Sequence, residues 1–515
     1  MKMPFEFEPA EMRKYLAPVL LGICLIFILF LPSFVEIIVA SGKRIPQPDI
    51  ITDYFKGWLW ALILGITILF WPVGRADKKA LIVLWAVKCV VMLGLMLAYE
   101  YHYQTDAFGY FAGARYAMCR WNELELGGPS TPVVFICWLH QHSFFDSFHA
   151  VKVTFGMIGL FSLYVFYRAA VIFLRQEKLV VLYIIALYPS ILFWSSILSK
   201  DALALLGMCV YCYGVIKFAR SGAIDSAIIM ILGLFYASSI RYWLAFIIGI
   251  PAIIVLVRAM PAKKNAVNIA IIVLIGAFVA FYSLKVMSAF HFKTAKDIAI
   301  VANDKYRGFA GGGSLVSEIK QEQVADASVP ITAAAAVEPA AAAVNPAAAA
   351  VKPAAAAVEP AAAAVEPAAA AVEPAAGAVK ATPAAVKAAS AAAPKKFGGI
   401  ADVILFVPRG IFTVLFRPLP WETRNMFSLF SGLEDLILLI LFSGAMLRLS
   451  RAKLKDPLVL WAIMVISFWA AAYGFVSYNL GTVSRYRLQI LPLFLGLILY
   501  LLFWNKGEIT EKKDK

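Results

Sequence analysis

The stretch WSSILSKDALAL, Trp194–Leu205, places Lys200 and Asp201 side by side in the middle of a long apolar region. Charged side chains are costly in lipid, so such a pair is rare inside a membrane-spanning helix. The apolar sequence on either side of the pair is long enough for a helix that crosses a bilayer. We therefore expect a tight turn at Lys200–Asp201, with one span before it and another after it.

The composition extends this interpretation to the whole chain. Of its 515 residues, 62% are hydrophobic and 15% are charged, whereas soluble domains are roughly half apolar and one quarter charged. The apolar residues form continuous runs without the alternation of a membrane β-barrel. Since a backbone in lipid must satisfy its own hydrogen bonds, these runs predict helices. The expected fold is an all-α polytopic membrane protein of about twelve spans, at 17–39, 57–74, 80–98, 151–173, 179–197, 201–218, 224–240, 242–260, 266–286, 433–449, 457–477 and 486–504.

Basic residues recur in every second loop between these spans, as in the cluster RLSRAKLK after the tenth span. Cytoplasmic loops are enriched in Lys and Arg, so both termini are expected in the cytoplasm. This pattern also accounts for the net charge of +15 without a nucleic-acid partner. The sequence has no basic domain with interleaved aromatic residues of the kind that binds nucleic acid.

The span pattern divides the chain into three parts. Residues 1–290 are expected to form an N-terminal membrane module of about nine spans with an outer loop at 99–150. Residues 291–399 form an extracytoplasmic segment in which AAAAVEP recurs with a period of seven. Recurring proline interrupts helices and alanine builds no core, so 325–395 is predicted to be a low-complexity linker. Residues 400–515 would begin with an interfacial or re-entrant segment and continue with three spans.

Several ionisable residues fall on the outer side of this topology. Asp106 lies among aromatic and small residues, and Tyr110 follows it by four positions, so both would lie on one face of an amphipathic helix. Arg241 occupies a second outer turn, in the sequence SSIRYW. Arg485 and Arg487 stand at the outer start of the last span.

Two interpretations of Lys200 and Asp201 remain open. Ser199 can cap the following helix, Asp201 would suit the positive end of its dipole, and Lys200 could extend to the interface. Alternatively, the pair binds substrate or takes part in catalysis. Among the other charges, Glu100 is expected to be an ordinary solvated residue. Lys88 in the third span needs a partner that the sequence does not identify.

The outer arginines point to an anionic ligand. They work against the positive-inside rule, so acidic partners or an anion should compensate for them. A guanidinium group matches phosphate oxygens in a bidentate way, and a lipid phosphate lies at this depth. Cations beside a carboxylate suggest transfer of a sugar from a polyprenyl phosphate to a hydroxyl. The carboxylate would take the hydroxyl proton, and the cations would stabilise the leaving phosphate.

Three stretches, TDAFGYFAGARYA, YPSILFWSSILSKDALAL and VSRYRLQILPL, resemble bacterial membrane glycosyltransferases of the GT-C type and the related exopolysaccharide and O-antigen polymerase-like proteins. In those families an Asp in an early outer loop is the presumed base, which implies this role for Asp106. A P-S-x-x-F-W-S-S-x-x-x-K-D element matches Pro189 to Asp201, and an R-Y-R-x-x-x-x-P element matches Arg485 to Pro492. The resemblance covers about half of the membrane part and none of the repeat.

The resemblance implies a GT-C-like enzyme of a bacterial inner membrane with its site on the periplasmic face. It would transfer a sugar from a polyprenyl-phosphate or diphosphate donor to a hydroxyl of a saccharide or lipid-linked acceptor. The expected catalytic residues are Asp106 and Asp201, and the expected substrate-binding residues are Tyr110, Lys200, Arg241, Arg485 and Arg487. The expected partners are this donor, this acceptor and the lipid bilayer, with no nucleic acid.

The alternative is a transporter or export component for lipid-linked saccharide, which is not an enzyme. Such proteins more often show paired halves and broken helices. A structural membrane subunit is a third interpretation, but it leaves the outer cations unexplained. No cofactor is predicted, although a divalent metal is compatible with the reaction. His140 and His142 could bind one, yet no third ligand follows at a zinc-like spacing, so no metal ligand is assigned.

Overall fold

The computed structural model describes residues 30–45, 47–103, 105–116, 130–259, 266–289, 399–423, 426–476 and 480–504. The chain divides into two units, of which one comprises Met1–Glu318 with Pro394–Lys515 and the other Ile319–Ala393. The second unit, and with it the predicted linker 325–395, lies outside the described residues.

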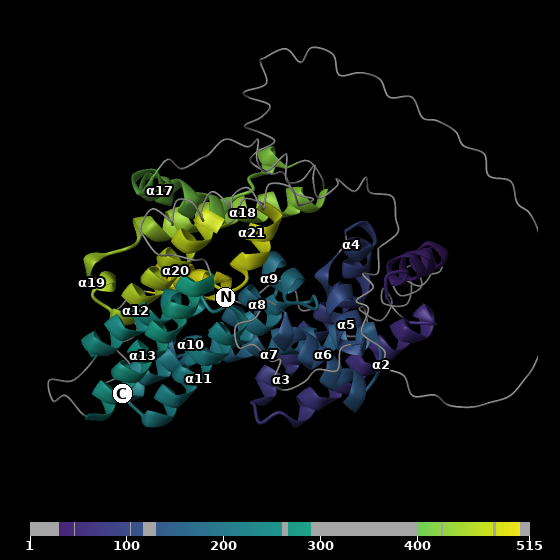
Figure 1. Ribbon diagram of the computed structural model, residues 1–515. Helices are drawn as coiled ribbons and strands as arrows, with labels where there is room; N and C mark the ends of the chain where they lie inside the picture. Colours follow the sequence, from purple (N-terminus) through teal and green to yellow (C-terminus); the bar gives the residue numbers. More distant parts are fainter. Residues whose placement is uncertain are drawn as a thin grey trace, which may run out of the picture. The chain divides into compact units, whose positions relative to one another are not determined.

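In the described ranges all regular secondary structure is helical (Figure 1). The labelled helices are α2 (Ile50–Thr67), η1 (Ile68–Phe70), α3 (Arg75–Val90), η2 (Val91–Leu95), α4 (Met96–His102), α5 (Asp106–Tyr116), α6 (Thr131–Ser143), α7 (Phe148–Leu174), α8 (Leu179–Ala186), α9 (Pro189–Trp194), α10 (Lys200–Ser221), α11 (Ile224–Ile240), α12 (Leu244–Ala259), α13 (Ala266–Ala289), α17 (Ile400–Phe416), η4 (Pro420–Glu422), α18 (Met426–Leu447), α19 (Arg451–Leu454), α20 (Pro457–Val476), α21 (Leu480–Arg487) and α22 (Leu491–Phe503).

Six helical segments are long and apolar enough to cross a membrane, which confirms an all-α membrane protein. They are Ile50–Phe70, Arg75–His102, Phe148–Leu174, Lys200–Ser221, Ser428–Leu447 and Pro457–Gly474. Five shorter apolar helices are Phe30–Gly42, Ile224–Ile240, Leu244–Ile254, Ile269–Lys285 and Leu491–Phe503. Each of these segments overlaps one of the predicted spans, so the hydrophobic pattern located the helices.

The remaining predicted span, 179–197, is wrong as a single helix. It consists of α8 and α9, which are separated at Leu187 and Tyr188. α9 begins at Pro189, which has no N–H to donate and disfavours helical geometry in the residue before it. A similar interruption separates α21 from α22, so the last apolar helix begins at Leu491 rather than at 486.

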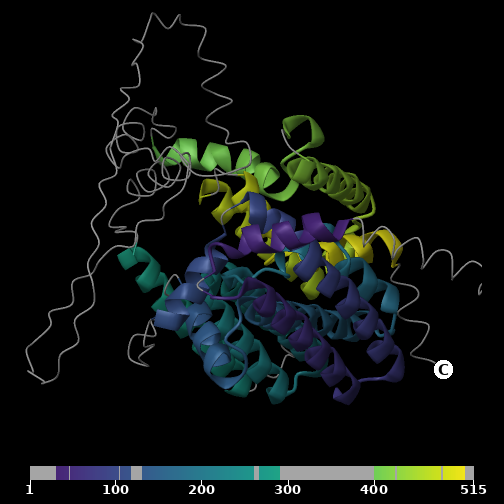
Figure 2. The same cartoon turned by 90° about the vertical axis from the view of Figure 1, so that its right-hand side faces the viewer.

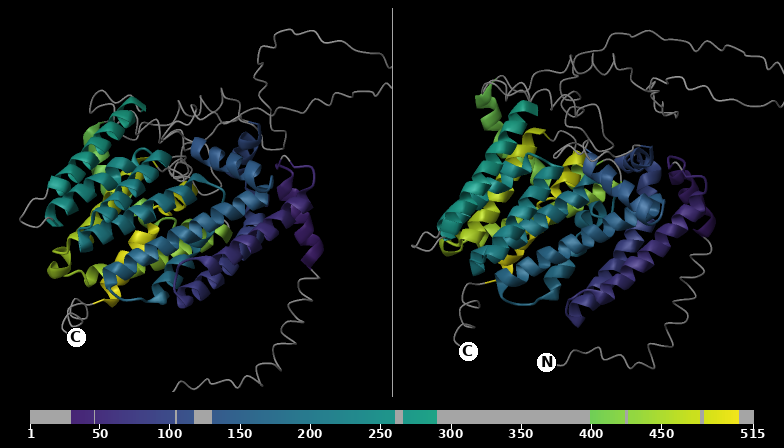
Figure 3. Two further views of the ribbon diagram at one scale, coloured as in Figure 1. Left: turned by 90° about the horizontal axis from the view of Figure 1, so that it is seen from below. Right: turned by 60° about the horizontal axis from the view of Figure 1, so that its bottom comes forward.

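The centre of the N-terminal part is formed by α7 and α10, with α2 and α3 against α7 and α11 against α10 (Figure 3). Glycines allow α10 and α11 to approach closely. A Cβ on Gly214 would lie 2.4 Å from the backbone nitrogen of Met230, and one on Gly233 would lie 2.3 Å from that of Tyr211. Because lipid tails are as apolar as the side chains, close packing of small residues is a main source of helix association in membranes.

The C-terminal helices pack onto this part of the chain. In Figures 1 and 2, α17 and α18 (green) lie on one side, with the yellow helices α20 to α22 between them and the blue and teal helices. α17, predicted as interfacial or re-entrant, is a helix that contains Pro408 and packs on α20. The indole N–H groups of Trp461 and Trp243 donate to the hydroxyls of Tyr211 (3.1 Å) and Tyr473 (2.8 Å), respectively. The residues before and after the long insertion therefore build one helical unit.

The two ends of α10 carry different chemistry. Lys200 begins the helix, whereas Arg220 near its end donates to the carbonyl of Phe173 at the end of α7 (3.4 Å). Lys178, which follows α7, lies over the ring of Trp504 at the end of α22 (4.7 Å). α10 has 22 residues, so at about 1.5 Å per residue it is about 33 Å long. These basic residues therefore lie about one membrane thickness from Lys200.

Candidate functional site

Asp201 is the centre of a charged cluster at the start of α10. Ser199 is the N-cap of this helix, and its hydroxyl accepts the backbone N–H of Asp201 (3.2 Å), which confirms the predicted cap. The side chain of Asp201 is fully buried, at 0% exposure. A buried carboxylate requires partners of opposite charge, so its neighbours decide what it does.

Two arginines from distant parts of the chain hold Asp201. Arg241, in the turn between α11 and α12, donates from Nη2 to Asp201 Oδ1 (2.7 Å). Arg485, on α21, donates from Nε to Asp201 Oδ2 (2.5 Å). Each carboxylate oxygen therefore has its own guanidinium partner, and three separate segments meet at one side chain.

Arg485 also reaches the first residue of α5. Its Nη1 donates to Asp106 Oδ2 at 3.2 Å. Asp106 is 63% exposed, whereas Arg485 is 21% exposed. Burial alone would lower the pKa of Arg485, but Asp201 and Asp106 outweigh this effect and raise it. Arg485 is thus a permanent cation that links a buried carboxylate to an accessible one.

Lys200 and Tyr110 complete the cluster. The Lys200 ammonium lies 5.9 Å from the centroid of the Tyr110 ring, within the range of a cation–π contact. Burial, and then the nearby Asp106 carboxylate, raise the pKa of Tyr110 to about 12, so its hydroxyl stays protonated at neutral pH. The predicted helix that contains both Asp106 and Tyr110 is confirmed as α5.

Aromatic rings hold the guanidinium of Arg241 in place. It lies 4.2 Å from the ring centroid of Tyr486 and 5.7 Å from that of Trp243. Its Nε makes no hydrogen bond within the described residues. Arg241 is therefore held by the two rings and by Asp201, and its Nε–H is buried without a hydrogen bond in the described residues.

Arg487 is the predicted site residue that the structure does not bring to the cluster. It is buried and pairs with Asp435 of α18 through Nη1 and through Nη2, the latter at 3.2 Å. It also donates to the carbonyls of Val414 (3.0 Å) and Arg417 (2.7 Å) at the end of α17. These contacts tie α21 to α17 and α18, so Arg487 supports the fold rather than a shared site with Arg485.

A cavity of about 400 Å³ lies beside this charged cluster. Ser484, which precedes Arg485 in the chain, is part of its wall, and the charges of Arg485 and Asp106 both act on Tyr99 in the same wall. The cavity is lined by Val91, Leu95, Tyr99, Tyr103, Pro189, Ser190, Leu192, Phe193, Trp194, Phe430, Ser431, Glu434 and Ser484. The π-helical turn η2 and the short helix α9 both contribute to it, so the helix interruptions shape this cavity.

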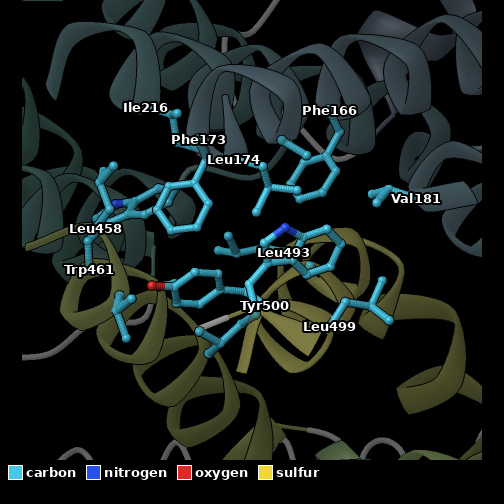
Figure 4. A pocket seen from close by; sticks show the side chains of 16 residues that line it. Phe166, Phe173, Leu174, Val181, Ile216, Leu458, Trp461, Leu493, Leu499 and Tyr500 are labelled. Atoms are coloured by element: carbon cyan, nitrogen blue, oxygen red, sulfur yellow. The ribbon is translucent and has the colours of Figure 1, made fainter. Parts of the chain in front are cut away.

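A second cavity, of about 60 Å³, lies near the other end of the helices (Figure 4). Its walls include Phe173, Trp461, Leu493 and Tyr500, and none of its lining residues is charged. Most of its lining side chains are apolar, so it is a poor candidate for the catalytic site.

Three buried polar pairs were not predicted from the sequence. The prediction that Glu100 is solvated is wrong, because it is buried and pairs with Lys152 of α7 (2.9 Å). Lys88 donates to the hydroxyl of Ser195 (2.5 Å), which identifies the missing partner. His149 contacts Asp53 at 2.6 Å. A charged residue in an apolar run is a signal in the sequence that a buried partner exists. The sequence does not identify the partner, because the two residues of each pair are 52 to 107 positions apart in the chain.

No group of three or more His, Cys, Asp or Glu residues that could hold a metal ion occurs in the described residues. His140 is packed between the rings of Trp60 and Phe144, and burial lowers its pKa to about 4. The His142 ring is hydrogen-bonded to the carbonyl of Trp138 through Nδ1 (2.8 Å). His140 therefore packs among aromatic rings and His142 bonds to the backbone of its own helix, so the structure does not bring the two histidines together as ligands of one metal ion.

The geometry therefore joins four of the five predicted substrate-binding residues with both predicted catalytic residues, and it separates Arg487 from them. Comparison with known proteins gave no match, since no family model, no curated protein and no solved structure is significantly similar to this chain.

Proposed function

We propose that this chain is a GT-C-like glycosyltransferase or polysaccharide polymerase of a bacterial inner membrane. It transfers a sugar from a polyprenyl-phosphate or diphosphate donor to an acceptor hydroxyl on the periplasmic face. The observation that carries the proposal is the meeting of two carboxylates and three cations from four separate segments. Structural ion pairs alone would not require an exposed carboxylate, such as Asp106, at the edge of the cluster.

Asp106 acts as the general base in this proposal. It is exposed and has one arginine partner, so the acceptor hydroxyl can approach it. The hydroxyl oxygen attacks the anomeric carbon while the bond from that carbon to the phosphate oxygen breaks. The hydroxyl proton goes to Asp106, and the phosphate leaves with the bonding electron pair. A single displacement of this kind inverts the anomeric configuration.

The cations bind the donor phosphate and stabilise the charge that grows on it. Arg485 and Lys200 are only partly buried, whereas Arg241 is buried and held by Asp201. Both oxygens of Asp201 are already occupied by arginines. Asp201 is therefore a positioning residue that fixes the two guanidinium groups, and the proton transfer belongs to Asp106.

The proposed orientation places the cluster on the periplasmic side and both termini in the cytoplasm, with about twelve spans. The support is that Arg220 and Lys178 lie at the helix ends remote from Lys200, as expected for cytoplasmic loops. The apolar helices provide surfaces along which a polyprenyl chain can lie.

The test is a deletion strain scored for surface or secreted polysaccharide and complemented with wild type or Asp106→Asn. We expect Asp106→Asn to lower product formation by about 10²- to 10⁴-fold, the usual contribution of a general base. A matched control is Asp225→Asn, which removes another exposed, ion-paired carboxylate at the opposite end of α10 and α11. If the Asp106→Asn protein is present at wild-type level and restores full product, the proposal is wrong.

A transporter of lipid-linked saccharide is the second candidate. The interrupted helices α8 and α9 beside a cavity favour it, because broken helices often build transporter sites. The same strains separate the two candidates. A transporter mutant accumulates complete lipid-linked saccharide inside the membrane, whereas a transferase mutant accumulates unused sugar donor.

A further inference from the structure

A groove that the proposed reaction does not use lies on α7, α10 and α11. It has a volume of about 770 Å³. The rings of Trp71 and Phe161, which pack edge to face at 5.7 Å, form part of its wall, and Phe161 is 43% exposed. Since α7 and α10 are long and apolar enough to cross a membrane, an exposed apolar side chain on them faces lipid. The groove therefore opens to the bilayer.

Two stripes of apolar residues line the groove, and each stripe leads to a basic residue. The members of each stripe are three or four positions apart and are not fully buried; they are Ile158, Phe161 and Val165 on α7, and Leu206, Val210 and Tyr213 on α10. Arg168 is the next residue of the first stripe, and Lys217 lies one helical turn beyond the second. The two helices end side by side, because Arg220 bonds to the carbonyl of Phe173. Both basic residues therefore lie toward the same end of the groove.

The length of the groove matches one leaflet of a membrane. Met157 and Arg168, the first and last lining residues on α7, are eleven positions apart, which is about 16 Å along a helix that rises about 1.5 Å per residue. The hydrocarbon core of a bilayer is about 30 Å thick, so one leaflet contributes about 15 Å. An acyl chain can therefore lie along the groove while its head group is at Arg168.

The guanidinium of Arg168 is accessible at this end of the groove. Its side chain is 38% exposed. Nη1 pairs with Glu177 Oε1 (3.0 Å) and with Asp77 Oδ2 (3.5 Å), whereas Nε and Nη2 make no hydrogen bond in the described residues. These two nitrogens form the edge of a guanidinium that can donate to two oxygens of one phosphate.

The neighbouring charges favour an anion at this end. The segments 75–79, 168–178 and 217–225 contain eight Lys or Arg residues and three Asp or Glu residues. The three acids are Asp77 and Glu177, which pair with Arg168, and Asp225, which pairs with Lys217 at 2.6 Å. The basic residues outnumber them, and basic pockets between membrane helices bind anionic head groups.

We propose that this groove binds an anionic phospholipid, with an acyl chain along the apolar stripes and the phosphate at Arg168. A zwitterionic phospholipid fits less well, because its cationic group would meet the same excess of Lys and Arg. The proposal does not depend on the proposed transferase activity, because no residue of the Asp201 cluster lines the groove.

The experiment measures binding by native mass spectrometry of purified full-length protein in a non-ionic detergent. The probes are phosphatidylglycerol and phosphatidylcholine with the same acyl chains. Wild type should bind phosphatidylglycerol about tenfold more tightly, because its net charge meets two basic residues at the head group. Arg168→Gln should lower the affinity for phosphatidylglycerol about fivefold, since one basic residue contributes about 1 kcal/mol. Equal affinities of wild type for the two lipids, or an unchanged affinity in Arg168→Gln, would overturn the proposal.

Arg451→Gln is the matched control for the charge. It removes an exposed arginine of α19 that does not line the groove, so the affinity for phosphatidylglycerol should stay at the wild-type value. An equal loss of affinity in Arg168→Gln and Arg451→Gln would indicate a general attraction of anionic lipid to basic loops and would contradict the site.

Val210→Trp tests the groove without a change of charge and is the second variant in case Arg168→Gln does not fold. The larger ring occupies the space of the acyl chain, so the affinity for phosphatidylglycerol should fall at least fivefold. Leu232→Trp, at an exposed position of α11 outside the groove, is its control. Thermal melting shows whether each variant is folded. If Val210→Trp binds the lipid as tightly as Leu232→Trp does, the groove does not hold it.

Competition with a polyprenyl phosphate identifies the kind of lipid. This lipid has a phosphate too, but its chain is longer than one leaflet, so at equal concentration it should leave phosphatidylglycerol bound to wild type. Displacement of phosphatidylglycerol would assign the groove to the lipid carrier and overturn the proposal. Asp106→Asn should bind phosphatidylglycerol like wild type, so failure of this proposal is distinguishable from failure of the proposed transferase activity.

Discussion

At the scale of single residues, the importance of Asp201 comes from its two partners. The alternation of basic loops in the sequence predicted that Asp106, Lys200, Arg241 and Arg485 share one side of the membrane. The sequence could not show that Asp201 is buried, since this depends on arginines 40 and 284 positions away. Ser199 and its cap were predictable because capping is a local property.

Asp201→Ala should strongly destabilise the protein. It leaves the guanidinium groups of Arg241 and Arg485 without their shared carboxylate, and breaking a buried charge pair typically costs about 3–5 kcal/mol. Melting temperatures of purified protein in detergent measure the effect. Asp225→Ala, which removes an exposed partner of Lys217, should change the melting temperature little. Equal melting temperatures for the Asp201→Ala variant and wild type would contradict the buried ion-pair network.

At the scale of elements, hydrophobic length predicted the long helices and failed at interruptions. The 179–197 run was apolar throughout, so its pattern resembled one span, and Pro189 was the local signal that the helix breaks there. The π-helical turn η2 has no comparable signal in the sequence. Glu434 lies in the apolar run LEDLILLI, but its hydrogen bonds with Ser190 depend on the packing of α18 against α9, which the run does not reveal.

Gly233→Ala should destabilise the packing of α11 on α10. The added Cβ would lie 2.3 Å from the backbone nitrogen of Tyr211, so the two helices must separate, and such overpacking typically costs about 1–3 kcal/mol. Melting temperatures in detergent again provide the measurement.

Gly276→Ala is the matched control for this substitution. Gly276 is also helical, on α13, but a Cβ there would meet no atom within 4 Å. Alanine is a better helix former than glycine by about 1 kcal/mol, so this variant should melt at or slightly above the wild-type temperature. A Gly233→Ala protein that is as stable as Gly276→Ala would refute the close approach of α10 and α11.

At the scale of the whole molecule, contacts from both sides of the insertion form one helical unit. Arg485 meets Asp201, Glu434 meets Ser190, and Trp461 meets Tyr211. The division of the chain into modules followed from the sequence, because the repeat is compositionally distinct. The mutual packing of the modules did not follow, since long-range partners leave no periodic pattern in the sequence.

The orientation in the membrane can be tested with Gly109→Cys and Lys79→Cys, two exposed positions near the cluster and near the basic loops. A thiol reagent that does not cross the inner membrane should label Gly109→Cys in cells with a permeable outer membrane. It should label Lys79→Cys only after the inner membrane is opened. The labelling of each variant is measured after subtraction of the labelling of wild type. If Lys79→Cys is labelled in cells with an intact inner membrane and Gly109→Cys is not, the proposed topology is inverted.

The sharing of Asp201 between Arg241 and Arg485 has a consequence for how this protein can change over generations. Loss of Asp201 leaves both arginines without their shared carboxylate, and loss of either arginine leaves one oxygen of the buried carboxylate without its partner. The three positions are therefore epistatic. Viable lineages should therefore keep the three residues together or exchange them together. A variant that lost one of them would be rescued by a second change within the same trio more readily than by changes elsewhere.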